Sequence, residues 1–364
     1  MSSPDTRRPL LLNPGPVTLS ERVRNSLLQP DLCHRESEFF DLQDDIRRRL
    51  LEVYGLDPAL WSAVLLTGSG TAAVEAMLSS LVPATGHLLV LENGVYGERM
   101  TQIAQRHGIA HETVRQEWTA PIDLAAVRKR LRAQPAITHV AAVHHETTTG
   151  RLNALGELAA LCSEFGVTLL ADTVSSFGAE AIDFAQPGFA AAAATANKCL
   201  HGVPGACFVM VRRAALEKAA ARTLYLDLAA WNRAQDQRGT PFTPSVHAYY
   251  ALREALCEFA DEGGLAARHA RYAALAGQVA EGLAALGVKP LLGSAESSVV
   301  LRAYHLPRKL GYTALHDGLK AKNFIIYAGQ GALASTLFRI STMGALGAAD
   351  MARLVDEVRG LLPV

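Results

Sequence analysis

The sequence VLLTGSGT, residues 64–71, joins an apolar run to a glycine-rich turn, and a helical pattern follows over residues 72–81. A turn of this kind exposes backbone N–H groups at the positive end of a helix dipole. The hydroxyls of Ser69 and Thr71 add further donors. The segment therefore predicts a strand, a turn and a helix, with a turn that can hold an anion.

Apolar runs of strand length recur on both sides of this segment, and each ends at a polar or glycine-rich turn. They cover residues 64–66, 88–91, 140–143, 167–171 and 208–211. Alanine-rich and leucine-rich segments of helical length lie between them. Continuous apolar runs are typical of parallel strands that are covered by helices on both faces. The predicted fold class is therefore α/β, with a large, doubly wound, mostly parallel sheet.

The pattern changes after about residue 255. A long helical stripe begins at Gly264, strand candidates follow at 298–303, 324–327 and 337–340, and an amphipathic helix closes the chain. We therefore expect three parts. Residues 1–20 form an N-terminal segment that reaches the active site and the small domain, residues 21–255 a large α/β domain, and residues 256–364 a small C-terminal α+β domain.

Charge and composition narrow the classes of function. The 35 basic and 35 acidic side chains cancel, which argues against a nucleic-acid partner bound through a bulk positive field. We find no apolar stretch long enough to cross a membrane, and the polar residues 1–8 do not resemble a signal peptide. The five scattered cysteines favour neither a metal site nor a disulfide framework, so a reducing cytoplasm is expected.

Two residues stand where an α/β sheet places its chemistry, beyond the carboxyl ends of strands. Asp172 directly follows the apolar run 167–171, and Lys198 follows the apolar run 189–196. Lys198 lies among alanine, cysteine and leucine, and burial of that kind favours the neutral, nucleophilic amine that forms a Schiff base. A helix-capping role for Asp172 and a surface position for Lys198 are the structural alternatives.

The glycine-rich turn alone is compatible with two kinds of ligand. Gly68-x-Gly70-x-x-Ala73 fits a dinucleotide fingerprint, with Glu92 about 20 residues further on. That interpretation makes the protein an NAD-binding Rossmann oxidoreductase. The other interpretation is a cup for a single phosphate. A plain turn in a non-catalytic α/β binding module is a third possibility.

The phosphate cup, the aspartate and the lysine together form the set that a pyridoxal phosphate enzyme needs. The cup anchors the cofactor, the aspartate pairs with the pyridine nitrogen, and the lysine bonds to the aldehyde. A dinucleotide enzyme has no use for the aspartate and lysine pair.

At this point the chain resembles the class V, fold-type I pyridoxal phosphate aminotransferases, most closely the 2-aminoethylphosphonate–pyruvate branch. The resemblance runs from Leu10 to the end, and eight motifs in order carry it. These are NPGP (13–16), GSGT (68–71), NGVYG (93–97), HETTTG (145–150), Asp172 with SSFG (175–178), NKC (197–199) with GVPG (202–205), FTP (242–244) and FRI (338–340).

The resemblance implies a role for each of a set of residues. Lys198 and Asp172 would be catalytic and would bind pyridoxal 5′-phosphate. Further cofactor contacts would come from Ser69, Gly70, Thr71, Tyr96, Thr147, Thr195 and Thr243. Thr243 would cap a helix that begins at Pro244 and would reach the phosphate of a neighbouring subunit, so a homodimer with shared sites is expected. Gly15 and Arg339 would hold the substrate carboxylate.

Some positions depart from the branch at the substrate end. His34-Arg35 resembles the serine–glyoxylate and alanine–glyoxylate aminotransferases, and Arg35 is a further candidate anion ligand. Tyr327-Ala328-Gly329-Gln330 stands where Tyr-Pro-Gly-Lys is usual. We expect amino transfer from 2-aminoethylphosphonate to pyruvate, giving phosphonoacetaldehyde and L-alanine. A serine/alanine–glyoxylate aminotransferase is the alternative. A cysteine desulfurase is not expected, since Cys199 directly follows the lysine and Cys257 lies in a helical pattern.

Overall fold

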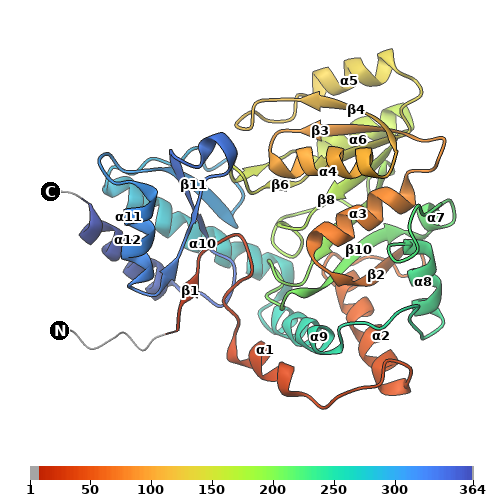
Figure 1. Ribbon diagram of the computed structural model, residues 1–364, viewed down its shortest axis with the longest axis horizontal. Helices are drawn as coiled ribbons and strands as arrows, with labels where there is room; N and C mark the ends of the chain where they lie inside the picture. The colour runs from red at the N-terminus through yellow and green to blue at the C-terminus, as the bar shows by residue number, and fades with distance from the viewer. Residues whose placement is uncertain (1–7, 363–364) are drawn as a thin grey trace.

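The computed structural model describes residues 8–362 and contains a large α/β part and a small α+β part (Figure 1). Residues 1–7 of the expected N-terminal segment lie outside the described residues. The small part, drawn in blue at the C-terminal end of the colour scale, lies beside the large sheet. The start of the described chain, in red, runs along the small part before it enters the large one.

The large part is built on one seven-stranded sheet. Its strands, in spatial order, are β2 (Trp61–Gly68), β10 (Gly205–Arg212), β9 (Phe189–Thr195), β8 (Thr168–Asp172), β5 (His139–Val143), β3 (His87–Glu92) and β4 (Ala110–Arg115). β10 pairs antiparallel with both neighbours, and the other strands run in one direction. The predicted mostly parallel sheet is confirmed.

Helices cover both faces of this sheet and create two separate cores. One face packs against α3 (Gly70–Leu81), α4 (Val95–Arg106), α7 (Arg213–Leu216) and α8 (Leu228–Asp236). The other face packs against α2 (Ser37–Glu52), α5 (Leu124–Ala133), α6 (Leu155–Phe165) and α9 (Val246–Asp261). Adjacent strand residues alternate between the cores, as Val64 and Leu65 do, so the continuous apolar runs are explained by burial on both sides.

Two strands differ from the sequence expectation. β9 is alanine-rich and contains no valine or isoleucine, the residues that usually mark a strand, yet it lies near the centre of the sheet and is buried. β4 is the edge strand next to β3, and its polar sequence AHETVR gives no apolar run. Pairing with neighbours, and not intrinsic propensity, makes both segments strands.

The small part has an antiparallel sheet in the order β11-β14-β13 and a short parallel pair of β1 with β12. Its strands are β1 (Leu10–Leu11), β11 (Leu301–His305), β12 (Phe324–Ile325), β13 (Tyr327–Ala328) and β14 (Leu337–Ser341). Its helices are α10 (Gly264–Ala285), α11 (Tyr312–Lys320) and α12 (Ala348–Leu361). The β1–β12 pair attaches the beginning of the described chain to this part.

The remaining elements are short. They are α1 (Glu21–Asn25), the 3₁₀ helices η1 (Ser26–Leu28) and η2 (Gly331–Leu333), and the hairpin of β6 (His145–Glu146) with β7 (Arg151–Leu152). The expected domain boundary at 255/256 falls inside α9, which packs on α2 and the large sheet through Tyr249 and Leu252. We propose that the boundary lies between α9 and α10. Over residues 8–362, no helix is both long and apolar enough to span a membrane.

The packing of α10 on α12 generates a prediction about two glycines in α10. A Cβ at Gly282 would lie 2.6 Å from Cγ2 of Val355, whereas a Cβ at Gly277 would meet no described atom within 4 Å. Gly282→Ala should lower the free energy of unfolding by about 1–3 kcal/mol through overpacking. Gly277→Ala should raise it by up to about 1 kcal/mol because alanine favours helix. Denaturant midpoints of both variants check this, and equal shifts would contradict it.

Candidate active site

Three strands bring polar residues to the same end of the large sheet, the edge formed by the carboxyl ends of its parallel strands and not the lateral edges at β2 and β4. β2 runs into the turn before α3, β8 ends at Asp172, and β9 ends at Thr195. β8 and β9 are parallel neighbours, so their carboxyl ends meet at this edge. The absence of a side chain at Gly70 lets the turn pack closely against Val174, since a Cβ at this position would lie 2.6 Å from Val174 Cγ1.

Asp172 is buried at this edge, with 7% of its surface exposed. The Val174 N–H donates to Asp172 Oδ1 at 3.0 Å. Burial raises the pKa of Asp172 from 3.8 to about 6, and the Val174 bond and the charges of Lys198 and Arg99 oppose that rise. The carboxyl therefore lacks a close cationic partner strong enough to offset its desolvation.

Lys198 follows β9 and is partly buried against the N-terminal segment. Its Nζ donates to the carbonyl oxygen of Pro14. Burial lowers the pKa of Lys198 from 10.5 to about 8, so a substantial share of the amine is neutral at mildly basic pH. Gly15 has φ +109°, and a Cβ there would lie 2.7 Å from Lys198 Cδ. A side chain at position 15 would therefore displace the lysine.

The turn before α3 presents its hydroxyls without using them all in the fold. Ser69 precedes α3 as its N-cap, but within the described chain its side chain makes no capping bond. Thr71 Oγ1 accepts from Arg99 Nη1 at 3.4 Å. Thr195 is buried and donates to Asn197 Oδ1 at 2.8 Å. The hydroxyls that the sequence singled out thus lie on adjoining elements of one edge.

Tyr96 and Arg99 lie one turn apart on α4, and the Arg99 guanidinium sits 4.8 Å from the centre of the Tyr96 ring. A small pocket lies between this pair, the first turn of α3 and the segment 172–174. It is lined by Gly70, Thr71, Val74, Tyr96, Arg99, Asp172 and Val174. Sequence reasoning missed Arg99, although its spacing of three residues from Tyr96 on a helix was a usable signal.

Two buried polar atoms on the segment 145–147 have no protein partner among the described residues. Thr147 Oγ1 and His145 Nε2 make no hydrogen bond to any residue of 8–362. His145 Nδ1 pairs with the Ser175 carbonyl at 2.9 Å, which places the proton on Nδ1 and leaves Nε2 as an acceptor. Burial lowers the pKa of His145 to about 4. Buried polar atoms are rarely left unpaired, so these two are expected to meet a ligand or water.

The small domain contributes Arg339, on β14, to the site beside Thr147. Arg339 is 3% exposed. Its Nε donates to Ala328 O at 2.8 Å, and its Nη1 donates to Thr147 O at 2.9 Å and to Gln330 Oε1 at 3.1 Å. These bonds fix the plane of the guanidinium beside Thr147 and leave Nη2 without a hydrogen-bond partner in the described chain.

Glu146 is a second residue that sequence reasoning did not single out for chemistry. It is completely buried, and burial raises its pKa from 4.5 to about 7. Its carboxylate accepts from Thr148 Oγ1 at 2.6 Å and from the Tyr96 N–H at 3.2 Å. Gly94 makes room for it, since a Cβ there would lie 2.2 Å from Glu146 Cδ. Glu146 therefore links the start of α4 to the 146–150 turn.

Two predicted site residues are not brought to this place within one chain. Arg35 is exposed on the segment between η1 and α2. Thr243 is also exposed. The prediction that Thr243 caps a helix starting at Pro244 is wrong, because α9 begins at Val246 and Ser245 is its N-cap. Proline does precede the helix, but two residues too early for its first turn.

The dinucleotide interpretation is excluded by the topology. In that fold the strands before and after the glycine-rich turn's helix are neighbours, but β2 lies at the sheet edge and four strands separate it from β3. Glu92 also has structural partners, since it accepts from Arg115 Nε at 2.6 Å and from the Thr101 hydroxyl. The glycine-rich turn is consequently not a Rossmann fingerprint.

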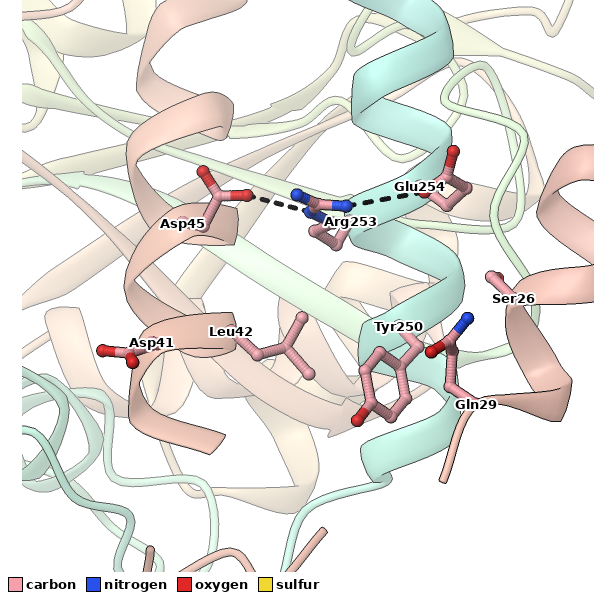
Figure 2. A pocket seen from close by; sticks show the side chains of 8 residues that line it. All are labelled: Ser26, Gln29, Asp41, Leu42, Asp45, Tyr250, Arg253 and Glu254. Atoms are coloured by element: carbon pink, nitrogen blue, oxygen red, sulfur yellow. Dashed lines mark hydrogen bonds and ion pairs between the residues drawn. The ribbon is translucent and has the colours of Figure 1, made fainter. Parts of the chain in front are cut away.

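The site does not coincide with a larger hollow between α2, α9 and the α1–η1 segment (Figure 2). That hollow has a volume of about 390 Å³. Arg253 lies across it and forms ion pairs with Asp45 at 3.0 Å and Glu254 at 3.6 Å. The charge of Arg253 is thus paired within the protein, whereas Thr147 Oγ1 and His145 Nε2 have no partner in the described chain.

The two-part α/β architecture is that of the fold-type I aminotransferases. Residues 25–305 match the family described as aminotransferase class-V, and the chain belongs to that family. Membership implies dependence on pyridoxal phosphate. A transaminase from Paraburkholderia phymatum, named 2-aminoethylphosphonate–pyruvate transaminase, is 39% identical over 94% of this chain and 93% of its own length. The protein of the same name from Aeromonas hydrophila is 40% identical over 92% of this chain and 90% of its own.

Solved structures agree with this placement. The alanine–glyoxylate aminotransferase from Nostoc sp. superposes with a TM-score of 0.91 at 28% identity, covering 100% of this chain and 97% of that one. The pyridoxamine–pyruvate aminotransferase from Mesorhizobium loti gives 0.90 at 27% identity, covering 99% and 94%. The predicted fold and family are confirmed.

The raised pKa of Asp172 predicts how the cofactor-free protein responds to pH. Its folded pKa of about 6 exceeds the ordinary 3.8, so the folded state binds the proton more tightly, and stability is lost as pH rises from about 4 through 6. Asp172→Asn mimics the protonated acid. At about pH 8 the cofactor-free variant should be more stable than the parent, by up to about 3 kcal/mol.

Chemical unfolding of both proteins between about pH 4 and 8 checks this, and the gap should narrow toward the acid end. Asp31→Asn is the matched control because the Asp31 side chain is fully exposed. A variant less stable than the parent at pH 8 would show that Asp172 is stabilised as a carboxylate without the cofactor.

Proposed function

We propose that this protein transfers the amino group of 2-aminoethylphosphonate to pyruvate and forms phosphonoacetaldehyde and L-alanine. The observation that carries the choice of substrates is the similarity, over nearly the full chain, to the transaminases of that name from P. phymatum and A. hydrophila. The arrangement of Lys198, Asp172 and Arg339 supports amino transfer as the reaction class.

The residues at the sheet edge fit pyridoxal 5′-phosphate. The buried amine of Lys198 suits its aldehyde, and the buried carboxyl of Asp172 suits its ring nitrogen. The unpaired Thr147 Oγ1 suits an oxygen substituent on the ring. Tyr96 offers an aromatic face. The phosphate would be held by Ser69, Gly70 and Thr71 at the start of α3 and by Thr195 at the end of β9, with help from the α3 dipole.

The cofactor, when bound, supplies a conjugated ring that accepts electrons from the substrate carbon. Asp172 would keep the ring nitrogen protonated, which a neutral side chain could not do as well. Lys198 Nζ would remove a proton from the substrate carbon that bears nitrogen and would then donate it to the cofactor carbon that was the aldehyde, because a pKa of about 8 lets it act as base and then as acid. Gly15 leaves space for the movement of Lys198.

Arg339 is proposed to bind the anionic group of each substrate. Its Nη2 remains available, while three acceptors hold the rest of the guanidinium in place. The carboxylate of pyruvate and the phosphonate of the donor would bind there in turn, together with the backbone of Gly15. A buried anion without such a partner would be strongly destabilised.

We further propose a homodimer, in which Thr243 approaches the cofactor phosphate of the neighbouring subunit and Arg35 approaches its substrate. Both residues are exposed in the single chain, which is compatible with contacts to a second copy. A cytoplasmic location is also proposed, and the five free thiols support it.

A glyoxylate-dependent aminotransferase is the second candidate. Two observations favour it: the His34-Arg35 segment, and the similarity to the Nostoc alanine–glyoxylate enzyme with a TM-score of 0.91. Both substrate pairs use the same cofactor chemistry, so only substrate preference separates the two candidates.

The first prediction here concerns the cofactor linkage. The purified protein should be yellow. Borohydride reduction should bleach it and leave the reduced cofactor, as a covalent label, on the peptide that contains Lys198. Lys198→Ala should lower kcat by at least about 100-fold because the proton-transfer group is lost. Lys320→Ala, at an exposed lysine, is the matched control and should keep colour and label. Label on another lysine would contradict the assignment.

The second prediction concerns the donor. The kcat/KM for 2-aminoethylphosphonate with pyruvate should exceed that for serine or alanine with glyoxylate by at least about tenfold, equivalent to about 1.4 kcal/mol in transition-state binding. Initial rates with each pair, measured at equal cofactor loading, check this. A tenfold preference for the glyoxylate pairs would contradict the proposed donor and would support a glyoxylate-dependent aminotransferase instead.

A further inference from the structure

Gln330 occupies a position next to Arg339 that no role yet explains. It lies between β13 and η2 as the N-cap of η2, and it is partly exposed. Its Oε1 accepts from Arg339 Nη1 at 3.1 Å and lies 3.4 Å from Thr148 Oγ1. The side chain therefore contacts both the anion-binding arginine and the turn that carries Thr147.

The orientation of the Gln330 amide follows from its partner. A guanidinium only donates hydrogen bonds, so the amide atom that faces Arg339 must be the oxygen. The Nε2 group then points away from Arg339 Nη1. It makes no hydrogen bond in the described part of the chain, so its two N–H donors remain available near Arg339.

The charge at this end of the site is small. Arg339 supplies one fixed positive charge, and the buried Glu146 carboxyl lies within electrostatic reach of it. Gln330 adds donors but no charge. A carboxylate carries one negative charge, whereas a fully ionised phosphonate carries two.

We propose that Gln330 is a specificity-determining residue, which holds Arg339 in place through Oε1 and offers Nε2 to the substrate's anionic group. This inference rests on the proposed function, because it takes Arg339 as the anion site. Within one subunit, this pair binds its ligand through one positive charge and a neutral amide, and the proposed approach of Arg35 from a neighbouring subunit would come in addition. Arg339 and Gln330 therefore accept carboxylates and phosphonates alike, with less advantage for the second phosphonate charge than two cations at these positions would give.

The test measures binding of two probes, acetate and methylphosphonate, to the holoenzyme by calorimetry at about pH 8.5, where the phosphonate carries nearly two charges. Gln330→Lys adds a cation and should tighten methylphosphonate by about tenfold but acetate by only about threefold. Gln330→Met keeps the length and removes the amide, and should weaken both probes by about fivefold. Thermal unfolding of each variant checks that the fold is intact.

Gln237→Lys is the matched control, since it adds the same charge at an exposed position at the end of α8 and should change neither probe. Parent-like binding of both probes to both Gln330 variants, within twofold, would overturn the proposal. Equal tightening of acetate and methylphosphonate by Gln330→Lys would overturn the charge argument. If the probes shift as expected but the parent does not turn over 2-aminoethylphosphonate, the proposed donor fails and the role of Gln330 stands.

Discussion

The candidate site depends on the burial of two ionisable groups of opposite charge, the Lys198 amine and the Asp172 carboxyl. Burial pushes each toward its neutral form, so the amine becomes easier to deprotonate and the acid harder to ionise. Pro14 O and the Val174 N–H offset this only in part. A ligand with an aldehyde and a basic ring nitrogen would satisfy both groups at once.

The lysine is held from both parts of the molecule. Arg268 on α10 is 2% exposed, and its Nη1 donates to the carbonyl of Cys199 at 2.6 Å. The Gly344 N–H donates to His201 Nε2 at 2.9 Å. Pro14 approaches from the N-terminal segment, which β1 ties to β12. The small domain therefore contributes to the position of the lysine as well as to the anion-binding Arg339.

Much of this arrangement was predictable because it depends on local patterns. The strands rich in valine and leucine are recognisable as continuous apolar runs, and Asp172 and Lys198 by the apolar runs that precede them. Arg339, which lies within β14, is identified only through the family resemblance. β9 was visible only as an apolar run, since alanine carries no strand preference. Glu146 was missed because its contacts with Gly94 and Tyr96 join segments far apart in the chain, whereas Arg99 was missed although Tyr96 lies one helical turn before it. Arg35 and Thr243 lie outside the single-chain site, because their proposed roles depend on a second subunit.

The alanines of β9 have a further consequence for the geometry of this edge. Ala191 and Ala193 share a core with α3, and the helix packs directly on this strand. Side chains with a single carbon set the helix close to the backbone of the sheet. Valine or isoleucine would suit the strand better on its own, but either would lift α3 and carry residues 69–71 away from Asp172. β9 thus works as a thin spacer, and its composition is constrained by the distance between two layers more than by the stability of the strand.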